Sequence, residues 1–202
     1  MNKQRQTTIE TYEWAAPELA EYFKNIGPRT EDINLVFDLL GDVKDPQIVE
    51  IGCGDGRDAQ EIIARTQNYV GFDVSGSFID IAKKKIPKGR FLVADAVDFE
   101  FPPNTDAIFA FASLLHLDKD EVGQVFAHAH SALKSGGLFY VSVKYKPEYT
   151  AEVKTDQFGE RLFYFYNDEL LINLAGEDYS VVKNWHKILS DTEWLELILQ
   201  KR

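Results

Sequence analysis

The sequence is poor in several residue types whose abundance would direct its interpretation. Among its 202 residues there is a single cysteine, Cys53, so no disulfide can form within the chain. No apolar run approaches the roughly 18 residues that a membrane-spanning helix needs, and the polar N-terminal residues do not resemble a signal peptide. These absences predict a cytoplasmic protein that does not associate with a membrane.

Basic residues are scarce relative to acidic ones. The sequence has 22 Lys and Arg against 33 Asp and Glu, which gives a formal net charge of −11. A protein with this charge repels phosphate backbones on average, so the composition argues against a nucleic-acid partner. The basic run at 83–85 falls late in a predicted helix, where the helix dipole favours lysine, and we interpret it as a solvated face.

Hydrophobic residues make up 45% of the chain, which suits one domain over 1–202 with a packed core. Residues 1–40 have apolar side chains at helical spacing and predict an N-terminal helical cap. Between residues 47 and 143, short apolar runs alternate with helix-compatible stretches. This rhythm predicts an α/β domain whose parallel sheet is covered by helices on both faces. Segment 144–166 breaks the rhythm, and we interpret it as an insertion or lid.

The chain after the insertion predicts a helix that ends at Ala175, followed by strands at 179–188 and 193–200 that form an antiparallel hairpin. In an open parallel sheet, ligands bind beyond the carboxyl ends of the strands. The residues that follow the predicted strands are therefore the candidates for a binding site. They are Gly52–Gly56, Asp73 and Val74, Asp95 and Ala96, Ala112–His116, and Lys144 and Tyr145.

The strongest signal is the glycine loop, Gly52-x-Gly54-x-Gly56. Closely spaced glycines let backbone N–H groups approach a ligand, and the helix that follows offers its positive N-terminus. A dinucleotide site has the spacing G-x-G-x-x-G, whereas here the third glycine comes one residue early. Glu50 and Asp55 flank the glycines and would repel a pyrophosphate but attract a sulfonium and an ammonium. The loop therefore favours S-adenosylmethionine, with NAD as the alternative.

Two further strands end in carboxylates. Asp73 follows the second predicted strand and can accept hydrogen bonds from both ribose hydroxyls, which NAD and S-adenosylmethionine share. Asp95 and Ala96 follow the third strand and offer a side-chain acceptor and a backbone N–H to an adenine ring. An isolated Asp after a strand is often only a turn residue. Acids after three consecutive strands favour a nucleoside site.

These segments resemble the class I, Rossmann-like family of S-adenosylmethionine-dependent methyltransferases, in its small-molecule branch. The resemblance covers about residues 30–200 and implies a seven-stranded sheet of order 3-2-1-4-5-7-6 with strand 7 antiparallel. No N-P-P-Y or D-P-P-Y motif of base methylation follows the fourth strand. The segments that resemble family motifs are Val49–Gly56, Gly71–Ser75, Ala94–Ala96, Ala110–Leu117 and Leu133–Gly137.

The resemblance implies a role for each position. The glycine loop and the end of the fourth strand would contact the methionine part of the cofactor, Asp73 the ribose, and the 95–96 segment the adenine. The residues expected to bind the cofactor are Glu50, Gly52, Cys53, Gly54, Asp55, Arg57, Asp73, Val74, Asp95, Ala96, Phe111 and Ala112.

Methyl transfer is an in-line displacement for which the cofactor supplies the activated carbon. The protein must align the reactants and exclude water, and a base helps only where the acceptor must lose a proton. His116 is the candidate base, although it also fits a purely structural role in the loop. Candidate substrate contacts come from the cap and the insertion. They are Tyr12, Trp14, Tyr22, Tyr145, Arg161 and Tyr164.

The sequence predicts a methyltransferase for a small-molecule acceptor, with no metal and with a monomeric or homodimeric assembly. Two alternatives stay open at this stage. One is a protein methyltransferase, which would need an open groove in place of a closed lid. The other is a sensor or accessory protein that binds S-adenosylmethionine without turnover, because acids at 50, 73 and 95 indicate binding and say nothing of catalysis.

Overall fold

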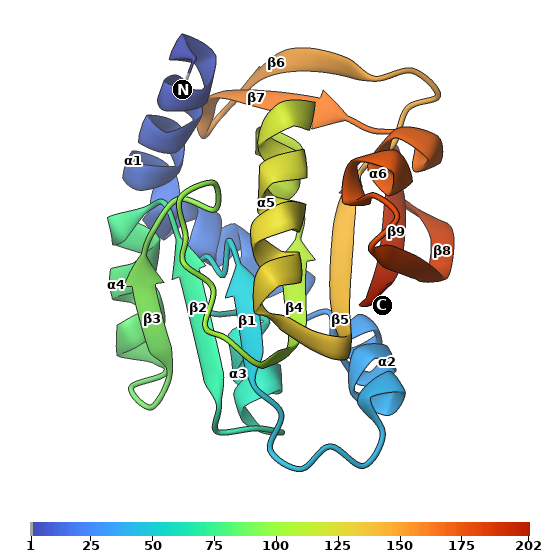
Figure 1. Cartoon of the computed structure of the whole chain (residues 1–202). Helices are drawn as coiled ribbons and strands as arrows, with labels where there is room; N and C mark the ends of the chain where they lie inside the picture. The colour runs from blue at the N-terminus through green and yellow to red at the C-terminus, as the bar shows by residue number, and fades with distance from the viewer. Residues whose placement is uncertain (1) are drawn as a thin grey trace.

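The computed structural model describes residues 2–202, and its centre is a seven-stranded sheet of order β3-β2-β1-β4-β5-β9-β8 (Figure 1). Strands β1 to β5 are parallel, β9 is antiparallel to β5, and β8 is antiparallel to β9. The strands of this sheet are β1 (Ile48–Ile51), β2 (Tyr69–Asp73), β3 (Arg90–Val93), β4 (Thr105–Phe111), β5 (Leu133–Lys144), β8 (Tyr179–Leu189) and β9 (Thr192–Lys201).

This order confirms the predicted fold class. The strands expected as the sixth and seventh are β8 and β9, which form the expected hairpin, and β9 is the antiparallel neighbour of β5. The numbering differs because two further strands, outside the large sheet, precede them in the chain.

Helices cover both faces of the sheet. Helices α2, α3 and α4 pack on one face, and α5 and α6 pack on the other (Figure 1). Strand β4 shows why. Phe109 and Phe111 pack in the apolar cluster that contains residues of α2, α3 and α4, whereas Ile108 and Ala110 pack in the cluster that contains residues of α5 and α6. Side chains alternate between the two faces along a strand. The helices are α1 (Lys3–Ile26), α2 (Thr30–Leu40), α3 (Ala59–Ile63), α4 (Gly76–Lys85), α5 (Lys119–Ala132) and α6 (Asp168–Ala175), and η1 (Leu114–His116) is a single 3₁₀ turn.

The segment 144–166 forms a second, two-stranded sheet. Strands β6 (Thr150–Asp156) and β7 (Gly159–Phe165) pair antiparallel and lie across the end of the large sheet toward which β1 to β4 point (Figure 1). The sequence predicted an insertion here but not its strands. Strand β6 is largely exposed and has charged side chains at alternate positions, so it lacks the apolar run by which the other strands were recognised.

Helix α1 lies beside this hairpin and leans on α4. Its small apolar residues Ala15, Ala16 and Leu19 pack against Phe78 of α4. Toward β7, the hydroxyl of Thr8 accepts a hydrogen bond from the Leu162 N–H over 2.8 Å. The cap and the insertion, which the sequence placed outside the core pattern, therefore meet above the strand ends. No helix within residues 2–202 combines the length and apolar character that crossing a bilayer requires.

Candidate active site

The glycine loop turns back over the end of β2. The N–H groups of Gly52 and Cys53 both donate to the carbonyl of Phe72, over 2.8 and 3.0 Å. Gly52 has φ +68°, and a side chain there would collide with Cβ of Ser113 in the loop after β4. Gly54 has φ +53° with open space where a side chain would lie. Glycine at these positions keeps the backbone in a left-handed turn and leaves room for a ligand beside it.

Asp73 lies at the end of β2 and faces this loop. One carboxylate oxygen accepts from the Gly54 N–H at 3.0 Å, and the other accepts from the Ser75 N–H at 2.9 Å. Burial nevertheless raises the pKa of Asp73 from 3.8 to about 6, because removing a carboxylate from water disfavours its charged form. A buried carboxylate with spare lone pairs is suited to accept hydrogen bonds from the two hydroxyls of a ribose.

The two acids that flank the glycines do not point toward a ligand. Glu50 is buried and accepts a 2.5 Å hydrogen bond from the hydroxyl of Tyr69, and burial together with the nearby charge of Asp58 raises its pKa well above the usual value. Asp55 forms a 2.9 Å ion pair with Lys85 of α4 and accepts from the Arg57 N–H. The argument that both acids attract a sulfonium and an ammonium therefore has no support in this geometry.

Asp95 is paired with the N-terminal helix. The buried guanidinium of Arg5 lies 2.6 Å from Asp95 and 3.1 Å from Glu121 of α5, so one cation ties α1 to two parts of the domain. The same Asp95 oxygen accepts from the Val97 N–H. Ala96 is buried beside it.

The loop after β4 carries polar groups without partners in the part of the chain that the structure describes. Ala112 has φ +51°, a strained conformation for alanine, and its N–H donates to Ser142. The next residue, Ser113, has a buried hydroxyl without a hydrogen-bond partner. Across the loop, Arg57 pairs with Asp58 at 2.8 Å but its Nε is buried and unpartnered. Such groups normally find partners, and here they flank the end of the glycine loop.

His116 is held through both ring nitrogens. Its Nδ1 lies 2.7 Å from the carbonyl of Leu162, so Nδ1 carries the hydrogen, and its Nε2 accepts the hydroxyl of Tyr12 at 2.8 Å. Burial, together with the positive charges of Arg161, Lys144 and Arg5, lowers the pKa of His116 to about 3. The imidazole is neutral, and its one lone pair is already in use. These contacts favour the structural role that the sequence left open for His116.

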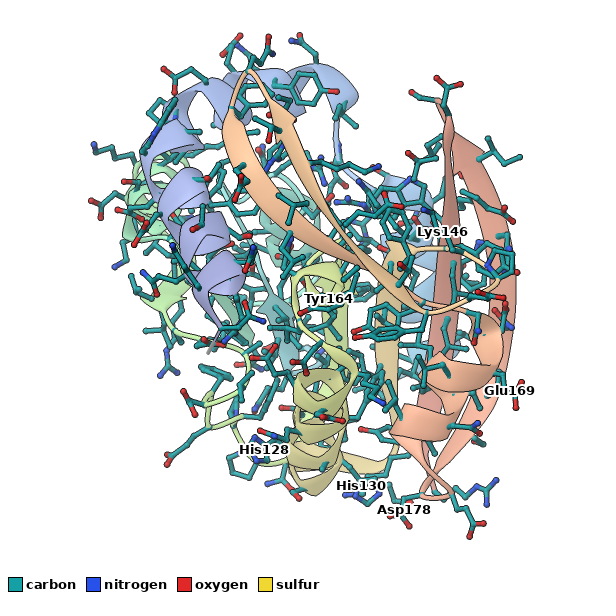
Figure 2. All side chains as sticks on the ribbon, turned by 90° about the horizontal axis from the view of Figure 1, so that it is seen from above. His128, His130, Lys146, Tyr164, Glu169 and Asp178 are labelled. Atoms are coloured by element: carbon teal, nitrogen blue, oxygen red, sulfur yellow. The ribbon has the colours of Figure 1, made fainter. Side chains whose placement is uncertain are left out.

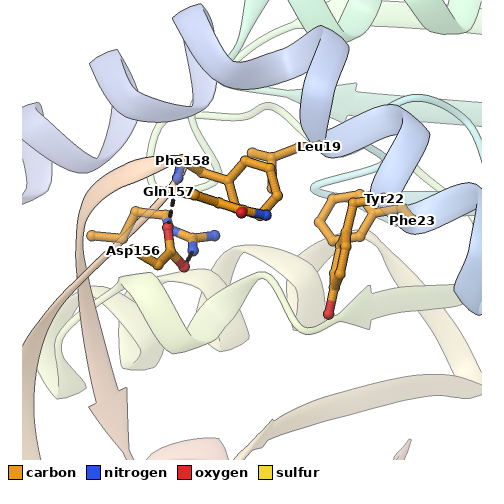
Figure 3. Close-up of a pocket in the computed structure, with 7 residues that line it drawn as sticks. Leu19, Tyr22, Phe23, Asp156, Gln157 and Phe158 are labelled. Carbon is orange, nitrogen blue, oxygen red and sulfur yellow. Dashed lines mark hydrogen bonds and ion pairs between the residues drawn. The ribbon is translucent and has the colours of Figure 1, made fainter.

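The predicted substrate residues divide into two groups. Tyr12 contacts His116, and the guanidinium of Arg161 lies 5.5 Å from the Tyr12 ring centroid. Arg161 and Tyr22 also line a pocket of about 370 Å³ between α1 and the β6–β7 hairpin (Figure 3). This pocket is lined by Leu19, Tyr22, Phe23, Asp156, Gln157, Phe158 and Arg161.

The other three candidates lie elsewhere. Trp14 is 64% exposed on α1. Tyr145 packs against His186 of β8 with ring centroids 4.4 Å apart. Tyr164 stacks on Tyr149 and lies above α5, on the side of the hairpin opposite Lys146 (Figure 2). Successive side chains of a strand point to opposite faces, so Tyr164 lies on the opposite face of β7 from Arg161 and Phe163.

Sequence reasoning missed three residues of this region, Arg5, Glu13 and Phe163, and it identified Lys144 only by its position, without a role. Arg5 and Glu13 belong to α1: Glu13 accepts hydrogen bonds from the hydroxyls of Ser75 and Ser77, each over 2.8 Å. Lys144 and Phe163 stand at the other side, where the ammonium lies 3.8 Å from the ring centroid. Lys144 directly follows a predicted strand, and that position was its available signal. Arg5 and Glu13 had none, because nothing local tells which face of an N-terminal helix is covered.

Comparison with known proteins agrees with this geometry. A family model described as a methyltransferase domain matches residues 48–137. Among curated proteins, the trans-aconitate 2-methyltransferase of an Acidovorax species is 32% identical over 111 residues, which are 52% of this chain and 42% of that protein. The chain spans about two fifths of the length of the first curated relatives that it matches.

Solved structures show the same fold. An S-adenosylmethionine-dependent methyltransferase from Methanosarcina mazei superposes with a TM-score of 0.71 at 18% identity, over 79% of this chain and 93% of that one. An amino pentose methyltransferase from Micromonospora echinaspora, solved with bound S-adenosylmethionine, gives 0.71 at 13% identity over 91% and 96%. The resemblance to methyltransferases is confirmed by the family model over residues 48–137, and the chain has the fold of these solved methyltransferases.

Proposed function

Starting from the class I methyltransferase fold and the methyltransferase-domain match at residues 48–137, we propose that the chain transfers a methyl group from S-adenosylmethionine to a small-molecule acceptor. The observation that carries this proposal is the contact between Gly54 and Asp73, which places a buried carboxylate beside an open glycine turn. The curated relatives include methyltransferases named for trans-aconitate and for magnesium-protoporphyrin. The net charge of −11 disfavours nucleic acid as a substrate or partner.

The residues present fit the cofactor. Asp73 would accept the ribose hydroxyls, and the turn at Asp95 and Ala96 would receive the adenine, with Val74 beside it. The unpartnered Arg57 Nε and Ser113 hydroxyl are donors for a carboxylate and lie with Phe111 and Ala112 at the end where the methionine part would extend. When bound, S-adenosylmethionine supplies an activated methyl carbon with a neutral thioether as its leaving group.

The contribution of the chain is alignment and exclusion of water. Helix α1 is tied over the strand ends by Arg5, Tyr12 and Glu13, so a cofactor on Asp73 would be covered. The Tyr12–His116 pair and the β6–β7 hairpin would bound the space beyond the sulfur. Holding the acceptor against the methyl carbon in this closed space provides the in-line geometry that displacement needs.

Calorimetric titration tests the proposal. We expect S-adenosylmethionine and S-adenosylhomocysteine to bind, and NADH not to bind. The Asp73→Ala variant should bind at least about tenfold more weakly, because it loses charge-assisted hydrogen bonds, with its fold intact by circular dichroism. The Trp14→Ala variant is the matched control, since Trp14 is exposed on α1, and should bind as wild type. Binding of NADH in place of S-adenosylmethionine would refute the proposal. Binding without release of S-adenosylhomocysteine from any acceptor would favour a sensor.

A further inference from the structure

Two cationic side chains, Lys144 and Arg161, gather at the acceptor side of the proposed site, in a chain that has a net negative charge. Lys144, at the end of β5, and Arg161, on β7, both lie over the ring of Phe163, with the charged groups 3.8 and 5.6 Å from its centroid. The same ring packs against His116 with centroids 4.9 Å apart. We propose that this cluster selects a carboxylic acid as the methyl acceptor and that methylation occurs on its ionised oxygen. This inference rests on the proposed function.

Lys144 has no anionic partner of its own. Among residues 2–202, ion pairs join Lys146 and Lys154 to Glu152 and join Arg161 to Asp156, and none involves Lys144. Burial, together with the positive charges of Lys154 and Arg161, lowers the pKa of Lys144 to about 8. A half-buried ammonium held beside other cations is stabilised when an anion binds to it. This environment is the opposite of the one that would hold a cationic amine substrate.

Arg161 has one hydrogen-bonding group free. Its side chain is 11% exposed and pairs with Asp156 through Nη2, yet its Nε is buried without a partner. Nε of Arg161 can donate a charge-assisted hydrogen bond to a carboxylate oxygen while Nη2 stays paired with Asp156. Arg161 and Asp156 both line the pocket beside α1, and Lys144 shares the ring of Phe163 with Arg161.

The contacts of His116 favour an acceptor that has no proton to lose. The lone pair of Nε2 is used by Tyr12, and Nδ1–H is used by Leu162. A hydroxyl or an ammonium acceptor would need a free base, whereas a carboxylate is ionised at neutral pH. In the transfer, a carboxylate lone pair forms the O–CH₃ bond while the C–S bond breaks, and its electron pair stays on sulfur. The products are a neutral methyl ester and a neutral thioether, and no proton moves.

Matched acids and amides test this inference. Phenylacetate, succinate and cinnamate are titrated into the protein by calorimetry, each beside its amide, with and without S-adenosylhomocysteine. We expect the acids to bind at least about tenfold more tightly than the amides, as a charged acceptor in a cationic site requires. With S-adenosylmethionine, the product should be a methyl ester by mass spectrometry. Equal binding of acids and amides, or no binding of any acid, would overturn the inference.

Variants locate the effect. Lys144→Gln should weaken binding of the acids at least about fivefold and leave S-adenosylhomocysteine binding unchanged, because Lys144 lies on the acceptor side. Lys183→Gln is the control, since Lys183 also lies over an aromatic ring, Trp185, but on β8, and should behave as wild type. Arg161→Gln is the second variant, checked by thermal unfolding. If Lys144→Gln binds acids as wild type does, the inference is wrong. If the wild type does not bind S-adenosylmethionine, the proposed function is refuted instead. The titrations of acids and amides without cofactor would still show whether the protein prefers acids.

Discussion

The raised pKa of Asp73 predicts that cofactor affinity depends on pH. Burial places the pKa of this carboxyl at about 6 in the free protein, against an ordinary value of 3.8. Ribose hydroxyls donate to the ionised carboxylate, so binding favours loss of the proton. Affinity should therefore rise as the pH increases through about 6 and level off above about 7. The ionised form is favoured in the complex because the N–H groups of Gly54 and Ser75 already donate to this carboxylate and the bound ribose hydroxyls would add two more donors.

The magnitude follows from the fraction of ionised Asp73. With a pKa of about 6, about a tenth of the molecules are ionised at pH 5 and nearly all at pH 7, so the dissociation constant should be about tenfold larger at pH 5, or about 1.4 kcal/mol. The pH dependence of the free energy of unfolding has the opposite sign to that of cofactor affinity. A carboxyl whose pKa is raised on folding adds stability at low pH that is lost as the pH rises from 3.8 through about 6, here at most about 3 kcal/mol without cofactor.

Calorimetry with S-adenosylhomocysteine between pH 5 and pH 7 measures this dependence. The Asp73→Asn variant should bind weakly with an affinity that does not change over this range. The Glu50→Gln variant removes another acid of the site whose pKa burial raises and should keep the wild-type profile, because Glu50 accepts a hydrogen bond from Tyr69. A wild-type affinity that is constant over this range would show that Asp73 is not the group that binds the ribose, or that it is ionised throughout.

Two substitutions and one pH profile probe the remaining contacts. Arg5→Met leaves Asp95 and Glu121 without their buried cation and should lower the free energy of unfolding by about 3 kcal/mol and weaken cofactor binding about tenfold, as measured by urea unfolding and calorimetry. Gly52→Ala should abolish cofactor binding and lower thermal stability, because the new Cβ would collide with Ser113 in a left-handed turn; an unchanged affinity would contradict the loop geometry. At saturating cofactor and acceptor, which keep Asp73 ionised and Lys144 protonated, the turnover rate of the wild type should be constant between pH 6 and pH 8, because the pKa of His116 is about 3. A bell-shaped profile under these conditions would restore His116 as a base.

The sheet could be predicted because its strands are buried on both faces. Strands β1 and β4 are buried throughout their length, so they appear in the sequence as short runs of mostly apolar residues. Strands β6 and β7 could not be predicted in this way. They cover the site from one side only, and the charged residues of β6 give the pattern of a loop.

The site was predictable as far as the backbone determines it. The positions after β1, β2 and β4 follow from topology, and the structure brings Gly54 and Asp73 into contact. Side-chain direction does not follow from topology. Asp55 has a suitable residue type at a suitable place, yet its carboxylate points to Lys85, a member of the lysine run that the sequence indicated was solvated. The partners of Asp95 and His116 come from α1, and pairing between residues 90 or 104 positions apart leaves no local trace.

The inner face of α1 has a consequence for how the protein folds. In the first half of the helix this face presents the buried polar residues Arg5, Thr8 and Thr11, whose partners are Asp95 and the β7 backbone at 160–162, 90 to 154 positions later in the chain. During synthesis α1 is made before β7 and has to remain undocked on this side until β7 exists, because contacts between distant residues form only after long loops close. A polar docking face stays hydrated during this interval, whereas an apolar face of the same size would be free to aggregate. The site is therefore completed at a late stage of folding, when α1 docks on a strand that is synthesised long after it.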